Sequence, residues 1–153
     1  MKRWLAIAAL LIVLDQASKF WITQWLAGGR TVEVSGFFNL VLVHNTGAAF
    51  SFLAHAAGWQ RGFFIAIAVF ASGWIVFLLR RHAHETFFCG ALALILGGAL
   101  GNLIDRIWIG AVVDFLDFHA AGWHWPAFNV ADSAITCGAA MLVMDSLRAT
   151  RAA

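Results

Sequence analysis

Long apolar runs separated by short polar segments dominate this chain, and they predict four membrane-spanning helices. The predicted spans are Trp4–Leu26, Gly62–Leu79, Thr86–Ile104 and Asn129–Leu147, with bounds good to a few residues. Each is long enough to cross about 30 Å of hydrocarbon at about 1.5 Å per residue. Because the apolar pattern continues well past Asp15, the first run is interpreted as a span and not as a removed signal peptide.

The segment between the first two spans has a different pattern. Thr31–Val34 and Phe37–Val43 are rich in β-branched and apolar residues, and Ser35-Gly36 between them is typical of a turn. This pattern predicts a β-hairpin or small sheet at the membrane surface. The expected fold class is therefore an all-α membrane protein of four transmembrane helices with a small outer-face β-structure. The 153 residues are enough for one integral membrane domain, residues 1–153.

Composition and charge agree with this topology. Hydrophobic residues make up 62% of the chain and charged residues 12%, about half the charged share of a soluble domain. Basic residues favour the cytoplasmic ends of spans, so both termini and the loop between spans two and three are expected in the cytoplasm, with segments 28–61 and 105–128 outside. No basic, aromatic-rich block favours nucleic-acid binding. The cationic clusters that set this orientation are Lys2, Arg3, Arg80, Arg81, Arg148 and Arg151.

Polar residues at membrane depth are the candidates for function, because each must be satisfied or functional. Asp15 and Lys19 lie four residues apart on one helix face, which favours a structural ion pair but leaves a catalytic role open. Asn102, Asp105 and Arg106 end the third span with a spacing that could direct all three into one outer cavity. The alternative is a helix end held at the interface by its own ion pair.

Asp114 and Asp132 are the candidates for a catalytic pair. Asp114 lies between apolar residues in the outer segment, and Asp132 lies in the first turn of the fourth span, three residues after Asn129. Taken alone, Asn129 and Asp132 fit a helix capping box. Two carboxyl groups in one cavity would share a proton, so one could activate water while the other polarises a peptide carbonyl. This chemistry needs no metal or cofactor, and none is expected.

The motifs around these residues resemble those of a known family, the lipoprotein signal peptidases (type II signal peptidases). They occur in the family's order and cover nearly the whole chain. The matching stretches are Asp15-x-x-x-Lys19, Asn45-Thr46-Gly47-Ala48-Ala49-Phe50-Ser51, Gly101-Asn102-Leu103-Ile104-Asp105-Arg106, Val112-Val113-Asp114-Phe115 and Phe128-Asn129-Val130-Ala131-Asp132-Ser133.

The resemblance implies a membrane aspartic endopeptidase of the bacterial inner membrane, with its active site near the outer leaflet. Its substrates would be diacylglyceryl-modified prolipoproteins, cut on the N-terminal side of the lipidated cysteine. Membrane lipids and globomycin-like cyclic peptide inhibitors would be its other partners. The resemblance also implies Asp114 and Asp132 as the catalytic dyad. The residues implied to line the substrate groove or orient the dyad are Asn45, Gly47, Asn102, Arg106 and Asn129.

A second class of function stays open from the residues alone. Asp15, Asp105 and Asp132 could form the relay of a small proton- or ion-coupled membrane carrier. Cleavage of a lipidated precursor by the purified protein would separate the two.

Overall fold

The computed structural model describes residues 1–47 and 59–152, and within them four helices are long and apolar enough to cross a membrane. These are α1 (Lys2–Trp25), α2 (Trp59–Arg81), α3 (Thr86–Trp108) and α4 (Val130–Ala152). A helix satisfies its backbone hydrogen bonds internally, which is why uninterrupted apolar runs adopt this form in a bilayer. The predicted spans are thus confirmed, with ends that shift by a few residues. The largest shifts are at the C-terminal ends of α4, which continues five residues past Leu147, and of α3, which continues four residues past Ile104.

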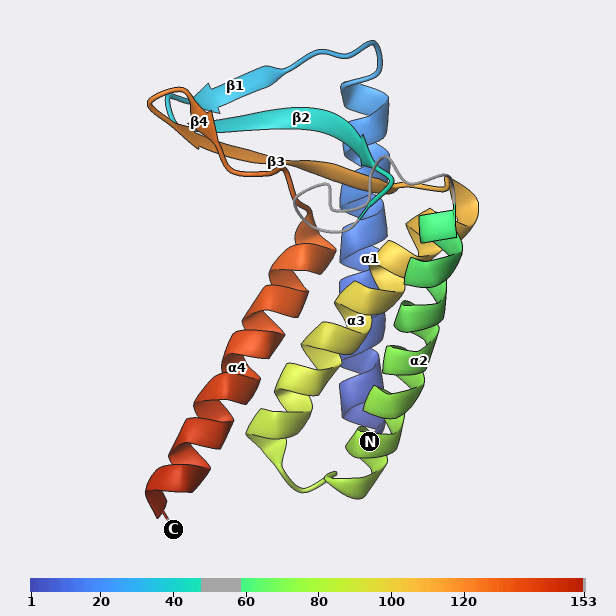
Figure 1. Cartoon of the computed structure of the whole chain (residues 1–153), viewed down its shortest axis with the longest axis vertical. Coiled ribbons are helices and arrows are strands. Elements are labelled where there is room, and N and C mark those ends of the chain that lie inside the picture. The colour runs from blue at the N-terminus through green and yellow to red at the C-terminus, as the bar shows by residue number, and fades with distance from the viewer. Residues whose placement is uncertain (48–58, 153) are drawn as a thin grey trace.

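The central helix of the bundle is α3, which packs against each of the other three helices (Figure 1). Small residues allow this close packing. A Cβ atom added to Gly97 would lie 2.7 Å from Leu11 Cδ2, and one added to Gly101 would lie 2.6 Å from Asp15 Oδ2. Gly97 and Gly101, four residues apart on α3, therefore form a close helix contact with α1.

An antiparallel sheet lies across one end of the bundle, opposite the N-terminus, the α2–α3 turn and the last turn of α4 (Figure 1). Its strand order is β1 (Val32–Ser35), β2 (Phe38–Asn45), β3 (Val112–Ala120) and β4 (Trp123–His124). The predicted hairpin corresponds to β1 and β2, with its turn one residue later than expected. The hairpin is extended by β3 and β4, two strands that the sequence pattern did not predict.

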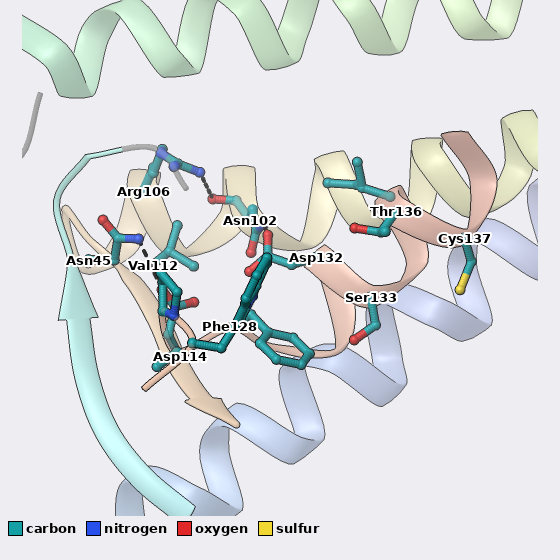
Figure 2. A pocket seen from close by; sticks show the side chains of 14 residues that line it. Asn45, Asn102, Arg106, Val112, Asp114, Phe128, Asp132, Ser133, Thr136 and Cys137 are labelled. Carbon is teal, nitrogen blue, oxygen red and sulfur yellow. Dashed lines mark hydrogen bonds between the residues drawn. The ribbon is translucent and has the colours of Figure 1, made fainter. Parts of the chain in front are cut away.

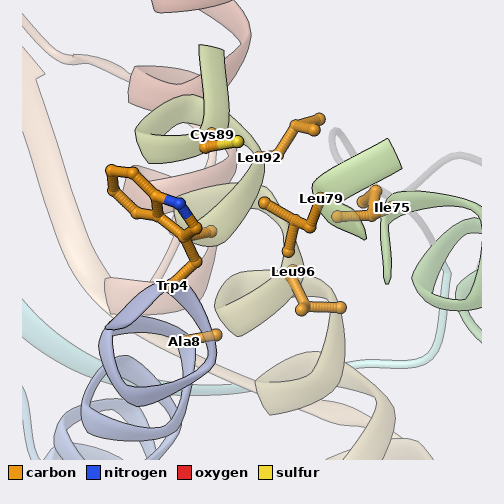
Figure 3. Close-up of a cluster of buried hydrophobic side chains, with 8 residues drawn as sticks. Trp4, Ala8, Ile75, Leu79, Cys89, Leu92 and Leu96 are labelled. Carbon is orange, nitrogen blue, oxygen red and sulfur yellow. The ribbon is translucent and has the colours of Figure 1, made fainter. Parts of the chain in front are cut away.

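Two apolar clusters hold these layers together. One lies at the end of the bundle away from the sheet and includes Trp4, Leu79 and Leu96 from three different helices (Figure 3). The other joins Ile22 and Leu26 of α1 to Phe115 of β3. Because Phe115 follows Asp114 directly in the strand, this second cluster anchors β3 to α1 beside the candidate site.

Candidate active site

A cavity of about 430 Å³ lies at the sheet end of the bundle, between α3, α4 and the ends of β2 and β3 (Figure 2). Along α4 the cavity reaches Thr136 and Cys137, and its apolar lining comes from Val112, residues 125–128 and Ile135. Five of the seven residues that the sequence analysis associates with catalysis or substrate contact line it, and Gly47 and Asn129 do not. The five are Asn45, Asn102, Arg106, Asp114 and Asp132.

The carboxyl group of Asp114 is held by two amide side chains. Asp114 lies on β3, is only 2% exposed, and receives hydrogen bonds from Asn45 Nδ2 at 3.0 Å and Asn129 Nδ2 at 2.7 Å. Burial raises the pKa of Asp114 to about 6; the negative charge of Asp132 adds to this effect, and the two amide hydrogen bonds oppose it. The proton of Asp114 is therefore held more tightly than that of an ordinary aspartate.

The second carboxyl group, that of Asp132, enters the cavity from the first turn of α4. Asn129 lies just before this helix, and its Oδ1 accepts the backbone N–H of Asp132 at 2.9 Å, so the predicted helix cap is present. The other contact expected of a capping box, from the Asp132 carboxylate back to the backbone N–H of Asn129, is replaced. The Asp132 carboxylate instead accepts a hydrogen bond from Asn102 Nδ2 of α3 at 2.8 Å.

The two asparagines connect the two aspartates. Asn129 is fully buried, and its Nδ2 donates to Asp114 while also lying 3.3 Å from Asn102 Oδ1. Asn102 in turn donates to Asp132. Amide side chains thus form a continuous path from one carboxyl group to the other, and this path uses residues of β3, α3 and α4.

A buried ion-pair network lies beneath this path. Lys19 Nζ is 2.8 Å from Asp15 Oδ2, the pair expected from the sequence, and 2.7 Å from Asp105 Oδ2 on α3. The side-chain amide of Gln16 lies 2.9 Å from Asp105 Oδ1. Asp15 also reaches α4, where its Oδ1 accepts the backbone N–H of Ala131 at 2.9 Å. The network therefore ties α1, α3 and α4 together below the cavity.

The sequence left two interpretations of the end of α3 open, and the one in which Asp105 enters the cavity with Asn102 and Arg106 is excluded; Asp105 is a structural polar residue. Asn102 and Arg106 line the cavity, whereas Asp105 turns toward Lys19 and accepts the backbone N–H of Val113 at 3.2 Å. At about 100° per residue, positions i+3 and i+4 fall on opposite sides of position i. The ammonium of Lys19 lies on the side of α3 that Asp105 faces, and it pairs with the carboxylate there.

Arg106 joins α3 to the end of β2. Its Nη2 donates to the carbonyl oxygen of Gly47 at 2.9 Å, and the Gly47 N–H donates to Asn45 Oδ1 at 3.0 Å. The guanidinium also lies 5.1 Å from the centre of the Phe64 ring. Gly47 therefore takes part through its backbone. The rest of its motif, residues 48–51, lies outside the described residues.

Two polar residues of this region were not identified from the sequence. Gln16 is a neighbour of Asp15, but nothing in the local pattern indicates that its side chain reaches α3. Arg61 on α2 donates to the carbonyl oxygens of Arg106 and Ile107 at 2.8 and 2.9 Å, and so satisfies the last turn of α3. A cationic residue at the start of a span is the signal that would have suggested such a contact.

The described residues contain no group of three or more histidine, cysteine, aspartate or glutamate side chains that could hold a metal ion. The polar lining of the cavity includes two carboxyl groups, the amides of Asn45 and Asn102, one guanidinium and the hydroxyl groups of Ser133 and Thr136. Such a set can bind and orient a peptide group and can exchange protons with it.

Known proteins resemble this chain over nearly its whole length. The family model described as signal peptidase (SPase) II matches residues 7–148, almost the entire chain. The chain belongs to the signal peptidase II family. A lipoprotein signal peptidase of Janthinobacterium sp. (strain Marseille) is 57% identical over 145 residues, which cover 95% of this chain and 88% of that relative. A lipoprotein signal peptidase of Paraburkholderia phytofirmans is 58% identical, and the match covers 97% of this chain and 86% of that relative.

The fold of this signal peptidase II family member also has a solved counterpart. A bacterial membrane enzyme whose structure was determined by the in meso method at 2.3 Å resolution superposes with a TM-score of 0.87 at 32% identity. The match covers 98% of this chain and 90% of that one. The four-helix architecture with its sheet is therefore an established architecture of a membrane enzyme.

Proposed function

We propose that the protein is an aspartic endopeptidase that removes the signal peptide from diacylglyceryl-modified prolipoproteins, cutting on the N-terminal side of the lipidated cysteine. The observation that carries this proposal is the convergence of Asp114 and Asp132, from different elements, on one cavity at the end of a membrane-spanning bundle. Membership of the signal peptidase II family supports the substrate class.

The two carboxyl groups divide the chemistry in this proposal. In the active form, in which the pair holds one proton, this proton lies on Asp114, whose pKa burial raises to about 6, and Asp114 donates it to the scissile carbonyl. Asp132 stays ionised at the N-terminus of α4, where the helix dipole favours negative charge, and takes a proton from the attacking water. The pair titrates as one unit, so this division is a preference between two protonation states.

The remaining cavity residues hold the pair and the substrate. Asn45, Asn102 and Asn129 supply the amide donors that fix the two carboxylates. Arg106 positions the end of β2 through the carbonyl of Gly47, and the apolar lining from Val112, residues 125–128 and Ile135 suits the lipid-bearing part of a substrate. A cyclic lipopeptide inhibitor of the globomycin type is expected to occupy the same cavity.

The proposed location is the bacterial inner membrane, with the sheet and cavity near the outer leaflet and both termini in the cytoplasm. The cationic residues at the opposite end support this orientation. At headgroup level, water reaches the cavity while the acyl chains of a substrate remain in the bilayer. Reporter fusions after Arg81 and Arg151 should report cytoplasm, and one within residues 120–122 should report the outside. An external Arg81 would contradict the proposed orientation.

The carrier alternative has less support from the geometry. Asp15 and Asp105 are bound to the ammonium of Lys19, and both are nearly inaccessible at 0% and 2% exposure. A proton relay needs carboxyl groups that a passing ion or proton can reach, and these two are enclosed by the bundle and occupied by the ammonium of Lys19.

The deciding experiment is cleavage of a synthetic diacylglyceryl-modified precursor peptide by the purified protein in detergent. Asp114→Asn and Asp132→Asn should each abolish cleavage while leaving the folded yield intact. Asp117→Asn is the matched control, because Asp117 is a buried carboxylate on the same strand that does not line the cavity. Cleavage should persist in EDTA. Loss of cleavage in EDTA that zinc restores would overturn the two-carboxylate mechanism.

A further inference from the structure

Lys19 has no part in the chemistry proposed above, yet it is one of the most constrained side chains in the molecule. It is 3% exposed, and its ammonium lies 2.8 Å from Asp15 Oδ2, 2.7 Å from Asp105 Oδ2 and 2.9 Å from Asn102 Oδ1. An ammonium has three N–H donors and no acceptor, so these contacts use its full capacity. Two would suffice for an ion-pair anchor, and the third reaches the active site.

The third contact, which is shorter than the 3.3 Å contact from Asn129 Nδ2 to the same oxygen, orients the Asn102 amide. An asparagine side chain can be turned over so that its oxygen and nitrogen exchange places. The ammonium of Lys19 can only donate hydrogen bonds. The Asn102 atom beside it must therefore be the oxygen, which can accept one. The Asn102 nitrogen must then face the opposite way, and there it donates to Asp132 Oδ1 at 2.8 Å.

A second contact of the same ammonium reaches the other aspartate. Asp105 is bound to Lys19 through Oδ2, and this oxygen also accepts the backbone N–H of Val113 at 3.2 Å. Val113 directly precedes Asp114 on β3. The ammonium thus lies two contacts from Asp132 by way of Asn102, and it also anchors the strand that carries Asp114.

We propose that Lys19 is a positioning residue for hydrolysis, which sets the donor direction of the Asn102 amide and the place of the Asp114 strand. This inference rests on the proposed peptidase function. Lys19 does not line the cavity, so it acts on the reaction through Asn102 and Asp105 and not through contact with the substrate. Without it, Asn102 can turn its oxygen toward Asp132, where it would repel the ionised carboxylate that activates water.

The test separates this role from simple stabilisation. Lys19→Met removes the ammonium and leaves Asp15 and Asp105 without their cation, which is expected to destabilise the fold. Lys19→Met combined with Asp15→Asn restores the charge, since one carboxylate and one ammonium are removed together and the network keeps its net charge of −1. The other charged groups around Lys19, namely Asp105 and Arg106 of α3, Asp114 of β3 and Asp132 of α4, are unchanged in both variants.

The double variant should regain much of the thermal stability lost in Lys19→Met, yet its kcat should stay about 100-fold below that of the wild type, the scale of a misplaced catalytic group. KM should change by less than about twofold, because the substrate-contacting wall is intact. The acidic limb of its pH–kcat profile should move to higher pH, because Asn102 no longer stabilises the ionised form of Asp132.

A double variant that regains both stability and kcat, with an unchanged pH profile, would overturn the positioning role and leave Lys19 as a structural ion-pair partner. Failure of the proposed function is a separate result: a wild-type protein that does not cleave the lipidated precursor. Wild-type cleavage that is lost in Asp114→Asn establishes the peptidase before the Lys19 variants are compared.

Discussion

Asp114→Asn is expected to gain stability relative to the wild type as the pH rises from about 4 to about 7, while it abolishes activity. Burial raises the pKa of Asp114 from 3.8 to about 6. The folded protein therefore binds this proton more tightly than the unfolded chain does. The contribution of Asp114 to stability is greatest below pH 3.8, falls as the pH rises toward about 6, and is constant above that value. The rise of the pKa from 3.8 to about 6 corresponds to about 3 kcal/mol lost at pH 7.

The amide of the variant has no such pH dependence, but it introduces a constant cost. One oxygen of Asp114 becomes an N–H donor, which faces the donor amide of either Asn45 or Asn129. This mismatch costs about 1–3 kcal/mol at every pH. The informative quantity is therefore the change with pH of the difference in unfolding free energy, variant minus wild type. It should rise by about 3 kcal/mol between about pH 4 and pH 7.

The assay is reversible unfolding in mixed micelles, followed by the fluorescence of the eight tryptophans of the chain. Asp117→Asn on the same strand is the control of opposite sign. Burial raises the pKa of Asp117, but hydrogen bonds from His124 and Asn39 outweigh this and lower it below its usual value. The stability that Asp117 contributes is present at neutral pH and lost as the pH falls through its lowered pKa. Parallel stability curves for wild type and Asp114→Asn would refute the reasoning.

Two further predictions concern the residues that hold the site. Asn129→Ser keeps a capping oxygen for α4 but loses the amide donor to Asp114. Its kcat should fall about 10- to 100-fold for the loss of about 1.5–3 kcal/mol. The alkaline limb of its pH–kcat profile should also move to higher pH, because the lost donor lowers the pKa of Asp114 in the wild type. An unchanged alkaline limb would exclude this role. Gly101→Ala places a methyl group 2.6 Å from Asp15 Oδ2 and should cost about 1–3 kcal/mol in unfolding experiments, whereas Gly73→Ala, with open space around it, should not.

The helices could be predicted from the sequence because the bilayer imposes a long apolar run on each of them. The end of α3 could not. Asp105 and Arg106 mark the end of an apolar run, but their charges are satisfied within the protein, by Lys19 and by the backbone around Gly47, so the helix continues past them. Hydropathy alone does not distinguish a charge that meets water from one that meets a partner on another helix.

The strand β3 was missed for a related reason. Residues 112–115 of β3 are all buried, because α1 packs against the strand at Phe115 and α3 contacts it as well. A strand that is buried on both faces lacks the alternating pattern of a half-exposed strand. The identity of the two aspartates was therefore accessible from the sequence, but the element that carries Asp114 was not.

Amide side chains hold the carboxyl groups of Asp114 and Asp132, and there is a physical reason for this. A cation in direct contact with both aspartates would hold both in the ionised form, and the pair could not keep the proton that one of them must donate. Asn102 and Asn129 donate hydrogen bonds without adding formal charge. The charge of Lys19 lies one residue further away, where it orients Asn102 and still leaves the pair able to share a proton. A lysine placed directly between the two aspartates would form ion pairs with both of them. Neither aspartate would then hold the proton that the proposed reaction needs.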